Sequence, residues 1–125
     1  MKPFILIAED NQTIADVYVD TFKSMGLMAH VIRDGKQVVE YFERRSAKIP
    51  ALLMLDVNLP NVSGLYILKY LRKKHDLPHM KIVMATANKL AIAAPEMALA
   101  DAVLEKPVMY DTLLDLVDEL VGFHG

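Results

Sequence analysis

The sequence Ala51-Leu-Leu-Met-Leu-Asp56 is an apolar run that ends in a carboxylate and leads directly into Val57-Asn-Leu-Pro-Asn-Val-Ser-Gly64. A short run without polar alternation is typical of a strand that is buried on both faces of a parallel sheet. An ionised carboxylate inside such a strand would lose its hydration at a high cost in free energy. We therefore expect Asp56 at the end of a buried strand.

Other apolar runs have the same arrangement, since each ends next to a polar residue that can carry chemistry. They are residues 4–8, followed by Glu9 and Asp10; residues 80–85, followed by Thr86; and residues 102–105, followed by Lys106 and Pro107. A further strand is expected at residues 27–32, where His30 indicates an edge position. Apolar residues at helical spacing predict helices between the strands, with Asp34 as the N-cap of the second helix.

Strands that alternate with helices imply one parallel sheet with helices on both faces and right-handed crossovers. Five strand-helix units suit a chain of 125 residues, so we expect a single α/β domain over residues 1–125. Parallel strands place all their carboxyl ends at one edge of the sheet, where such folds bind ligands. The polar residues that follow the apolar runs are therefore expected to converge, although they span almost the whole chain.

The composition excludes several classes of protein. A net charge of -2 provides no electrostatic case for binding nucleic acid or a membrane surface. No apolar stretch approaches the roughly 20 residues of a membrane span, and residues 1–3 lead into a strand rather than into a signal peptide. The absence of Cys excludes disulfides and thiolate metal sites and fits a reducing compartment. We expect a cytoplasmic location.

Carboxylates at the ends of neighbouring strands repel one another, and a hard divalent cation with oxygen ligands relieves that repulsion. Mg²⁺ suits such a site and takes phosphate oxygens as its remaining partners. A Lys and a Thr hydroxyl at the same edge can then stabilise an anion. The sequence contains no glycine-rich loop of the P-loop or dinucleotide-binding type, so we expect the protein itself to carry the phosphoryl group, as an aspartyl phosphate.

Short motifs follow one another in a fixed order along the chain. They are Glu9-Asp10, Asp56, Asn58-Leu-Pro60, Gly64, Thr86-Ala87 and Lys106-Pro107. Together they resemble the motifs of the receiver domains of two-component response regulators, over essentially the whole chain. The resemblance implies a flavodoxin-like three-layer fold, with a doubly wound five-stranded parallel sheet of order 2-1-3-4-5 and five helices. It also implies a signalling switch, not an enzyme, that catalyses only its own phosphorylation and dephosphorylation.

Under this resemblance, Asp56 is the phosphoacceptor, and a histidine kinase or a histidine phosphotransfer protein is the phosphoryl donor. Asp10, Asp56 and the backbone carbonyl of Asn58 are the expected ligands of Mg²⁺, with Glu9 acting through a water molecule. Gly64 is expected to have a structural role. Phosphorylation is expected to alter the binding of a downstream protein at the surface of the fourth helix, the fifth strand and the fifth helix.

The same resemblance implies roles for residues around the phosphoryl group. Thr86 would close onto the phosphoryl oxygens, Lys106 would pair with the group, and the Lys106-Pro107 peptide bond would be cis. Asn58 and Asn88 match positions that tune how easily water attacks the aspartyl phosphate.

Two features depart from the family pattern. Val103 stands three residues before Lys106, where the family has the aromatic residue of its rotating switch, so coupling through such a ring is not expected. Pro95 falls inside the stretch of the fourth helix, where an internal proline costs about 3 kcal/mol but a proline in the first turn costs almost nothing. We therefore expect an irregular segment at residues 88–94 and a short helix at about residues 95–99.

Each polar residue taken alone fits an ordinary role, such as a helix cap or a solvated charge. Chance alone does not explain why a suitable residue type stands at each of four separate strand ends. A second hypothesis, a phosphorylation-independent interaction module on a receiver fold, rests on Val103 and Pro95. A flavin-binding protein or a phosphatase is a third, and the lack of a Ser/Thr/Gly-rich loop after the first strand disfavours flavin. His75 and His79 are not expected to bind a metal together, because Pro78 prevents a shared helical face.

Overall fold

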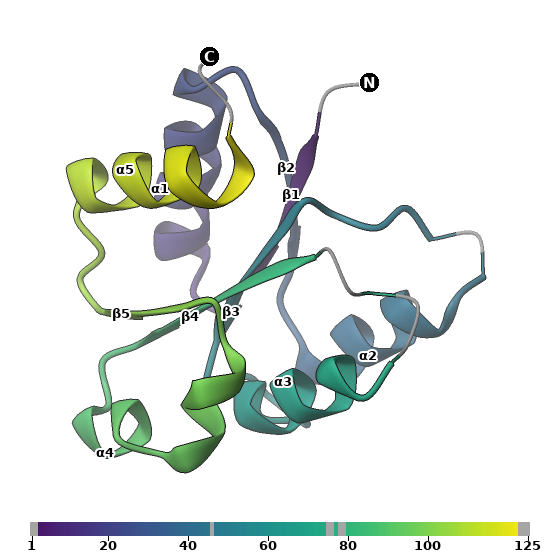
Figure 1. The fold of residues 1–125 in the computed structure, drawn as a ribbon. Helices are drawn as coiled ribbons and strands as arrows, with labels where there is room; N and C mark the ends of the chain where they lie inside the picture. The colour runs from purple at the N-terminus through teal and green to yellow at the C-terminus, as the bar shows by residue number, and fades with distance from the viewer. Residues whose placement is uncertain (1–2, 46, 75–76, 78–79, 123–125) are drawn as a thin grey trace.

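The apolar runs form one sheet in the computed structural model of the chain, which describes residues 3–45, 47–74, 77 and 80–122 (Figure 1). The strands are β1 (Phe4–Ala8), β2 (Met28–Ile32), β3 (Leu52–Asp56), β4 (Lys81–Thr86) and β5 (Ala102–Glu105). All neighbouring pairs are parallel, and the order is β2-β1-β3-β4-β5. The predicted doubly wound sheet of order 2-1-3-4-5 is therefore confirmed. His75, Pro78 and His79 lie outside the described residues.

The burial of each strand follows from its place in this order. β3 lies in the middle of the sheet, and all of its residues are buried. β2 lies at an edge and is only partly covered, and His30 on it is exposed. The edge position predicted from a polar side chain in an apolar run is therefore confirmed.

Five α-helices and one short 3-10 helix follow the strands in the described part of the chain. They are α1 (Gln12–Ser24), α2 (Gly35–Glu43), α3 (Gly64–Arg72), α4 (Lys89–Ile92), η1 (Pro95–Leu99) and α5 (Tyr110–Val121). A short polar side chain precedes four of them, because its oxygen accepts a hydrogen bond from a free N–H group of the first turn. These caps are Asn11, Asp34, Ser63 and Asn88. The cap predicted at Asp34 is confirmed.

The helices cover both faces of the sheet, so the molecule has three layers (Figure 1). α1 and α5 lie on one face, over a core that includes Ile7 and Met54. α2 and α3 lie on the other face, over a core that includes Leu6 and Leu53. Each such aliphatic side chain contributes about 1.5–3 kcal/mol when it is fully buried. Within the described ranges, no helix combines the length and the apolar composition that a membrane span requires.

The segment between β4 and β5 differs in part from its prediction. The expectation of an irregular segment at residues 88–94 is wrong, because α4 forms within it. The Oδ1 atom of Asn88 accepts hydrogen bonds from the N–H groups of Leu90 and Ala91, which stabilises this single turn. The short helix expected from about Pro95 is present as η1, with the proline in its first turn. The proline therefore separates two short helices and interrupts neither.

Gly64 begins α3 at a point where that helix touches the end of β3. A Cβ atom at this position would overlap the carbonyl oxygen of Asp56 and lie 2.8 Å from the carbonyl carbon of Asp56 and from the Cα of Val57. The Gly64 N–H group also donates to the Val57 carbonyl at 2.8 Å. These are backbone atoms, which cannot rotate aside as a flexible side chain does, so the position has room only for glycine.

We expect Gly64→Ala to lower the free energy of unfolding by about 2–3 kcal/mol, because the new methyl group forces α3 away from the end of β3. Urea denaturation followed by circular dichroism measures this loss. Gly122→Ala is the matched control, because a Cβ there meets no described atom within 4 Å and only the left-handed φ of 68° opposes it. The control should lose about 1 kcal/mol, and equal losses would contradict the steric explanation.

Candidate functional site

Residues that lie far apart in the sequence meet at the carboxyl edge of the sheet. Glu9 directly follows β1, Asp56 is the last residue of β3, and Lys106 directly follows β5. The parallel register pairs Asp56 with Ala85, one residue before Thr86, so the strands end at nearly the same level. The fold thus brings together side chains from three strand ends around one point.

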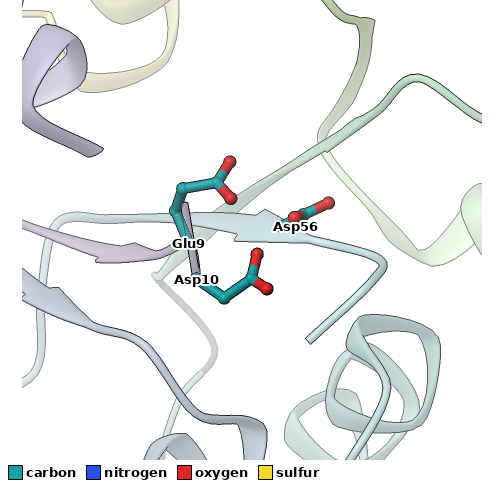
Figure 2. A group of neighbouring side chains, drawn as sticks. All are labelled: Glu9, Asp10 and Asp56. Carbon is teal, nitrogen blue, oxygen red and sulfur yellow. The ribbon is translucent and has the colours of Figure 1, made fainter. Parts of the chain in front are cut away.

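Glu9, Asp10 and Asp56 form an acidic cluster, in which one carboxylate oxygen of each residue lies within 4.8 Å of those of the other two (Figure 2). Glu9 is 1% exposed and Asp56 is 5% exposed, whereas Asp10 faces solvent. Asp56 stands at the end of its strand, as predicted. Its side chain is nevertheless buried, which requires a compensating charge nearby.

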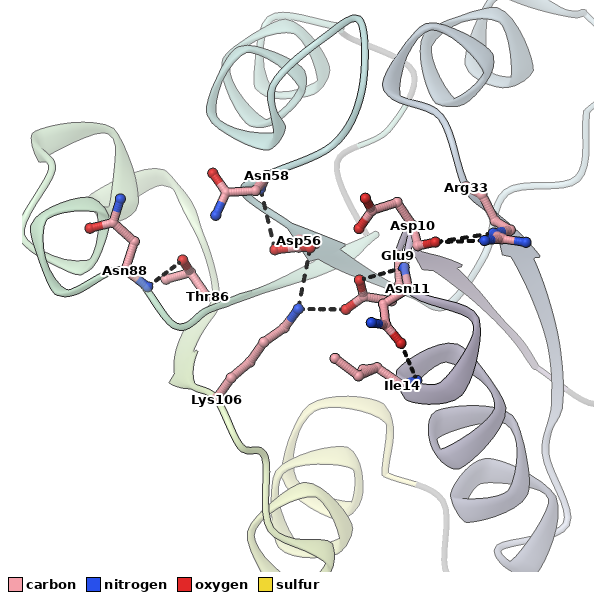
Figure 3. A network of polar contacts seen from close by, with 10 residues as sticks. All are labelled: Glu9, Asp10, Asn11, Ile14, Arg33, Asp56, Asn58, Thr86, Asn88 and Lys106. Carbon is pink, nitrogen blue, oxygen red and sulfur yellow. Dashed lines mark hydrogen bonds and ion pairs between the residues drawn. The ribbon is translucent and has the colours of Figure 1, made fainter.

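The Lys106 side chain supplies that positive charge. Its Nζ atom lies 2.5 Å from Oε1 of Glu9 and 3.2 Å from Oδ2 of Asp56 (Figure 3). The backbone N–H group of Lys106 donates to the Thr86 carbonyl at 2.9 Å, which continues the pairing of β5 with β4 beyond the strand end. The Lys106-Pro107 peptide bond is cis, in line with the resemblance.

Burial and charge act together on the pKa values of this ion pair. Burial raises the pKa of the Glu9 carboxyl group, and the negative charge of Asp56 adds to the effect, so the contact with Lys106 offsets only part of it. Burial by itself lowers the pKa of the Lys106 ammonium group, but its hydrogen bond to Glu9 and the charges of both carboxylates outweigh burial and raise the pKa. Lys106 therefore stays protonated, and the cluster keeps an excess of carboxylates over ammonium groups.

Backbone N–H groups engage the second carboxylate oxygen of Glu9 and of Asp56, so the Asp10 carboxylate is the part of the cluster that stays open to a cation. Oε2 of Glu9 accepts a hydrogen bond from the Asn11 N–H group at 3.2 Å, and Oδ1 of Asp56 accepts one from the Asn58 N–H group at 3.3 Å. Among the described residues, Asp10 makes polar contacts only through its backbone carbonyl, so its carboxylate is free. Three carboxylates with one ammonium group suit a hard divalent cation such as Mg²⁺, whose ligands are oxygen atoms.

Thr86 and Asn88 lie on the same edge and are bonded to each other. The Thr86 side chain is fully buried, and its hydroxyl oxygen accepts a hydrogen bond from the backbone N–H group of Asn88 at 3.0 Å (Figure 3). The side chain of Asn88 is engaged as the cap of α4. The side chain of Asn58, by contrast, is exposed beside Asp56.

Val103 lies on β5 opposite Met84 of β4. It is half buried and packs on the same core as Ala91 of α4 and Met97 of η1. A valine has no ring that could rotate between an inward and an outward position. The contact between β5 and the α4–η1 segment is therefore aliphatic where the family pattern has an aromatic residue.

Sequence reasoning missed Arg33, which follows the edge strand β2 and donates two hydrogen bonds to the backbone carbonyl of Asp10. A signal was available, because Arg33 stands directly after an apolar run, as Glu9 and Lys106 do. The identity of its partner had no such signal, because the partner is a backbone atom and every residue carries a carbonyl group.

Comparisons with known proteins agree with this geometry. The family model of the response regulator receiver domain matches residues 5–118. The polar-differentiation response regulator DivK of Brucella ovis is 24% identical over 126 residues, which cover 98% of this chain and 98% of the relative. A CheY-like receiver domain from Methylobacillus flagellatus has a TM-score of 0.83 at 25% identity and covers 96% of this chain and 99% of its own.

A further solved structure is the receiver domain of a sensor histidine kinase from Pseudomonas aeruginosa PAO1, with a magnesium ion coordinated in its active site cleft. It has a TM-score of 0.86 at 23% identity over 98% of this chain and 99% of its own. At 23% identity, this structural similarity establishes the fold alone. The strand order, the acidic cluster at the carboxyl edge and the match over residues 5–118 together show that this chain belongs to the family of response regulator receiver domains.

Proposed function

We propose that this chain is the phosphoacceptor domain of a two-component phosphorelay, in which Asp56 accepts a phosphoryl group from a histidine kinase or a histidine phosphotransfer protein. One observation carries the proposal: the buried Asp56 carboxylate lies 3.2 Å from the Lys106 ammonium group and next to the carboxylates of Glu9 and Asp10. A carboxylate in such a setting can act as a nucleophile, because the fixed positive charge of the ammonium group stabilises the oxygens of the phosphoryl group that the carboxylate accepts.

Asp10, Asp56 and the backbone carbonyl of Asn58 are the proposed ligands of Mg²⁺, with Glu9 contributing through a water molecule. The free carboxylate of Asp10 and the excess of negative charge in the cluster support this assignment. When bound, Mg²⁺ supplies positive charge that offsets the charge of the cluster and of the phosphoryl oxygens.

Phosphoryl transfer at this site is a substitution at phosphorus. A carboxylate oxygen of Asp56 forms the new P–O bond while the P–N bond of the donor phosphohistidine breaks, and the imidazole leaves with the bonding electron pair. Lys106 remains protonated and lies within reach of Asp56, so its ammonium group can stabilise the transferred oxygens. The burial of Asp56 limits the access of water to the product.

Thr86 is the proposed sensor of the phosphoryl group. Its oxygen accepts a hydrogen bond from Asn88, which leaves the hydroxyl proton available for a phosphoryl oxygen. Since Asn88 caps α4, a displacement of Thr86 toward Asp56 would displace the first turn of α4 as well. This route does not require an aromatic ring at Val103.

Asn58 and Asn88 are proposed to influence hydrolysis of the aspartyl phosphate from different positions. Asn58 is exposed next to Asp56, so its side chain can contact a water molecule that approaches the phosphoryl group. Asn88 is engaged with α4 and would act through its bond to Thr86.

The proposed surface for a downstream protein comprises α4, β5 and α5. Exposed apolar side chains on these elements and their connections support it. Leu90 on α4 is 84% exposed, and Met109 and Tyr110 at the start of α5 are 64% and 50% exposed. A partner that covers such side chains gains free energy from the loss of apolar surface in contact with water.

Mg²⁺ should raise the thermal midpoint of the wild-type protein, and the rise should be larger in Lys106→Met. Without the ammonium group, Glu9 and Asp56 are buried without a compensating cation, which costs about 3–5 kcal/mol in the metal-free protein. Mg²⁺ then supplies part of the missing positive charge, and it stabilises the protein because it binds the folded state alone. Thermal unfolding in EDTA and in excess Mg²⁺ measures both effects.

Lys36→Met is the control for this experiment, because it removes one exposed positive charge outside the cluster. Its response to Mg²⁺ should equal that of the wild type. Asp10→Asn should respond less than the wild type, because it removes a proposed ligand. A response of Lys106→Met no larger than that of the wild type would contradict the charge compensation proposed here.

Incubation with acetyl phosphate and Mg²⁺ should add one phosphoryl group to the wild-type protein, as measured by intact mass spectrometry. The gain should disappear in EDTA and in Asp56→Asn, and it should persist in Asp16→Asn, which changes an exposed carboxylate on α1. A gain that survives in Asp56→Asn would place the phosphoryl group on another residue. No gain in folded wild-type protein would favour the phosphorylation-independent interaction module.

A further inference from the structure

Arg33 connects the end of β2 to the loop that carries Asp10 (Figure 3). Its Nε and Nη2 atoms donate to the Asp10 backbone carbonyl at 3.2 Å and 2.8 Å, and its Nη1 atom donates to Oε1 of Gln12 at 2.8 Å. Gln12 in turn donates to Oδ1 of Asp16 at 2.7 Å, one turn further along α1. One guanidinium group therefore bonds the loop on both sides of Asn11.

The carboxylate of Asp10 has no comparable restraint of its own. In the part of the chain that the structure describes, Asp10 makes its polar contacts through its backbone carbonyl, which accepts two hydrogen bonds from Arg33. The direction of its side chain toward Glu9 and Asp56 therefore depends on the backbone at Asp10. A guanidinium group that donates two converging hydrogen bonds to one carbonyl oxygen, from a rigid planar fork, restricts the position of that peptide group.

The positive charge of Arg33 and its hydrogen bonds have opposite effects on the affinity of the cluster for a cation. A guanidinium group beside the acidic cluster lowers the repulsion among the carboxylates, but it also repels an incoming divalent cation. Among the described residues, Arg33 forms no ion pair with a carboxylate, so its charge is not neutralised by contact. The exposed position of Arg33 weakens both charge effects through screening by solvent, whereas the paired hydrogen bonds still restrict the loop.

We propose that Arg33 is a positioning residue for the divalent cation site, which acts by fixing the backbone of Asp10 so that its carboxylate faces Glu9 and Asp56. This inference rests on the proposed function, because it assigns the cation to the acidic cluster. It goes beyond that function, because Arg33 contacts neither the cation ligands' carboxylate oxygens nor the phosphoacceptor.

The residues that follow Arg33 restrain the second loop of the site in a similar way. Nδ2 of Asn61 donates to Oδ2 of Asp34 at 2.5 Å, and the N–H group of Gly35 donates to the Pro60 carbonyl at 3.0 Å. Asn61 has a left-handed φ of 70°, so the loop after β3 has a specific conformation that these bonds stabilise. The junction of β2 with α2 therefore bonds the loop of Asp10 on one side and the loop after Asp56 on the other.

The test compares Mg²⁺ binding by Arg33→Gln, Arg33→Lys and the wild-type protein, measured by isothermal titration calorimetry. We expect Arg33→Gln to raise the Mg²⁺ dissociation constant about three- to tenfold, at or below the range for residues that orient metal ligands, because Arg33 is exposed. Arg33→Lys keeps the charge but loses the paired bonds, so it should also weaken binding. Lys36→Gln removes an equal charge from the neighbouring turn of α2 and should leave the constant within about twofold of the wild type.

A second measurement separates positioning from general damage to the fold. The rate of phosphorylation by acetyl phosphate is measured against Mg²⁺ concentration in the same variants. Arg33→Gln should need more Mg²⁺ for half of its maximal rate and should reach the wild-type rate at saturation. A lower maximal rate, with an unchanged requirement for Mg²⁺, would overturn the positioning role.

Three outcomes of the calorimetry have distinct meanings. If Arg33→Gln binds Mg²⁺ as tightly as the wild type, or more tightly, the positioning role is wrong while the proposed function stands. If Arg33→Lys binds Mg²⁺ as tightly as the wild type and Arg33→Gln binds it more weakly, the affinity depends on the charge of Arg33 and not on its paired hydrogen bonds. That result also overturns the positioning role. If the folded wild-type protein binds no Mg²⁺, the proposed function fails, and the role of Arg33 fails with it.

Discussion

The contact of one ammonium group with two buried carboxylates is the interaction on which the site depends. Glu9 and Asp56 are almost fully removed from water, and each would lose several kcal/mol of hydration if no cation met it. Lys106 meets both, at 2.5 Å and 3.2 Å. It lies 97 residues from Glu9 in the sequence, so the contact exists only when β5 has paired with β4 at the far side of the sheet. The positive charge that compensates the acidic cluster is therefore in place only in the fully folded domain.

The imbalance of charge in the acidic cluster distinguishes it from a purely structural ion pair. Asp10, Glu9 and Asp56 bring three carboxylates against one ammonium group, and Asp10 is left open to solvent. A purely structural ion pair would be neutral and shielded from solvent, and it would have no net charge to attract a further ion. An acidic excess favours the binding of a divalent cation, and on this the proposed function is based. The excess of carboxylates and the exposed side of Asp10 are thus features that a purely structural site would lack.

The sheet and its caps were open to prediction because their causes are local. Residues 52–56 are apolar up to Asp56 because the strand has helices on both faces, and Asp34 caps its helix through a bond to an N–H group two residues away. Residues 88–94 were predicted wrongly for a related reason. A helix of one turn is too short to display a period, and the prediction rested on Pro95 alone, whereas Asn88 caps this turn in the structure.

The sequence by itself determined the class of fold, the edge at which the site lies and the kinds of side chain that meet there, because burial on two faces and parallel connections impose simple patterns on the chain. Only the tertiary structure decided which atoms meet: the Lys106 ammonium group with two carboxylates, Arg33 with the carbonyl of Asp10, and Gly64 with the backbone of Asp56. These contacts depend on how separate elements pack to within a fraction of an ångström, and no local pattern of residue types encodes that distance.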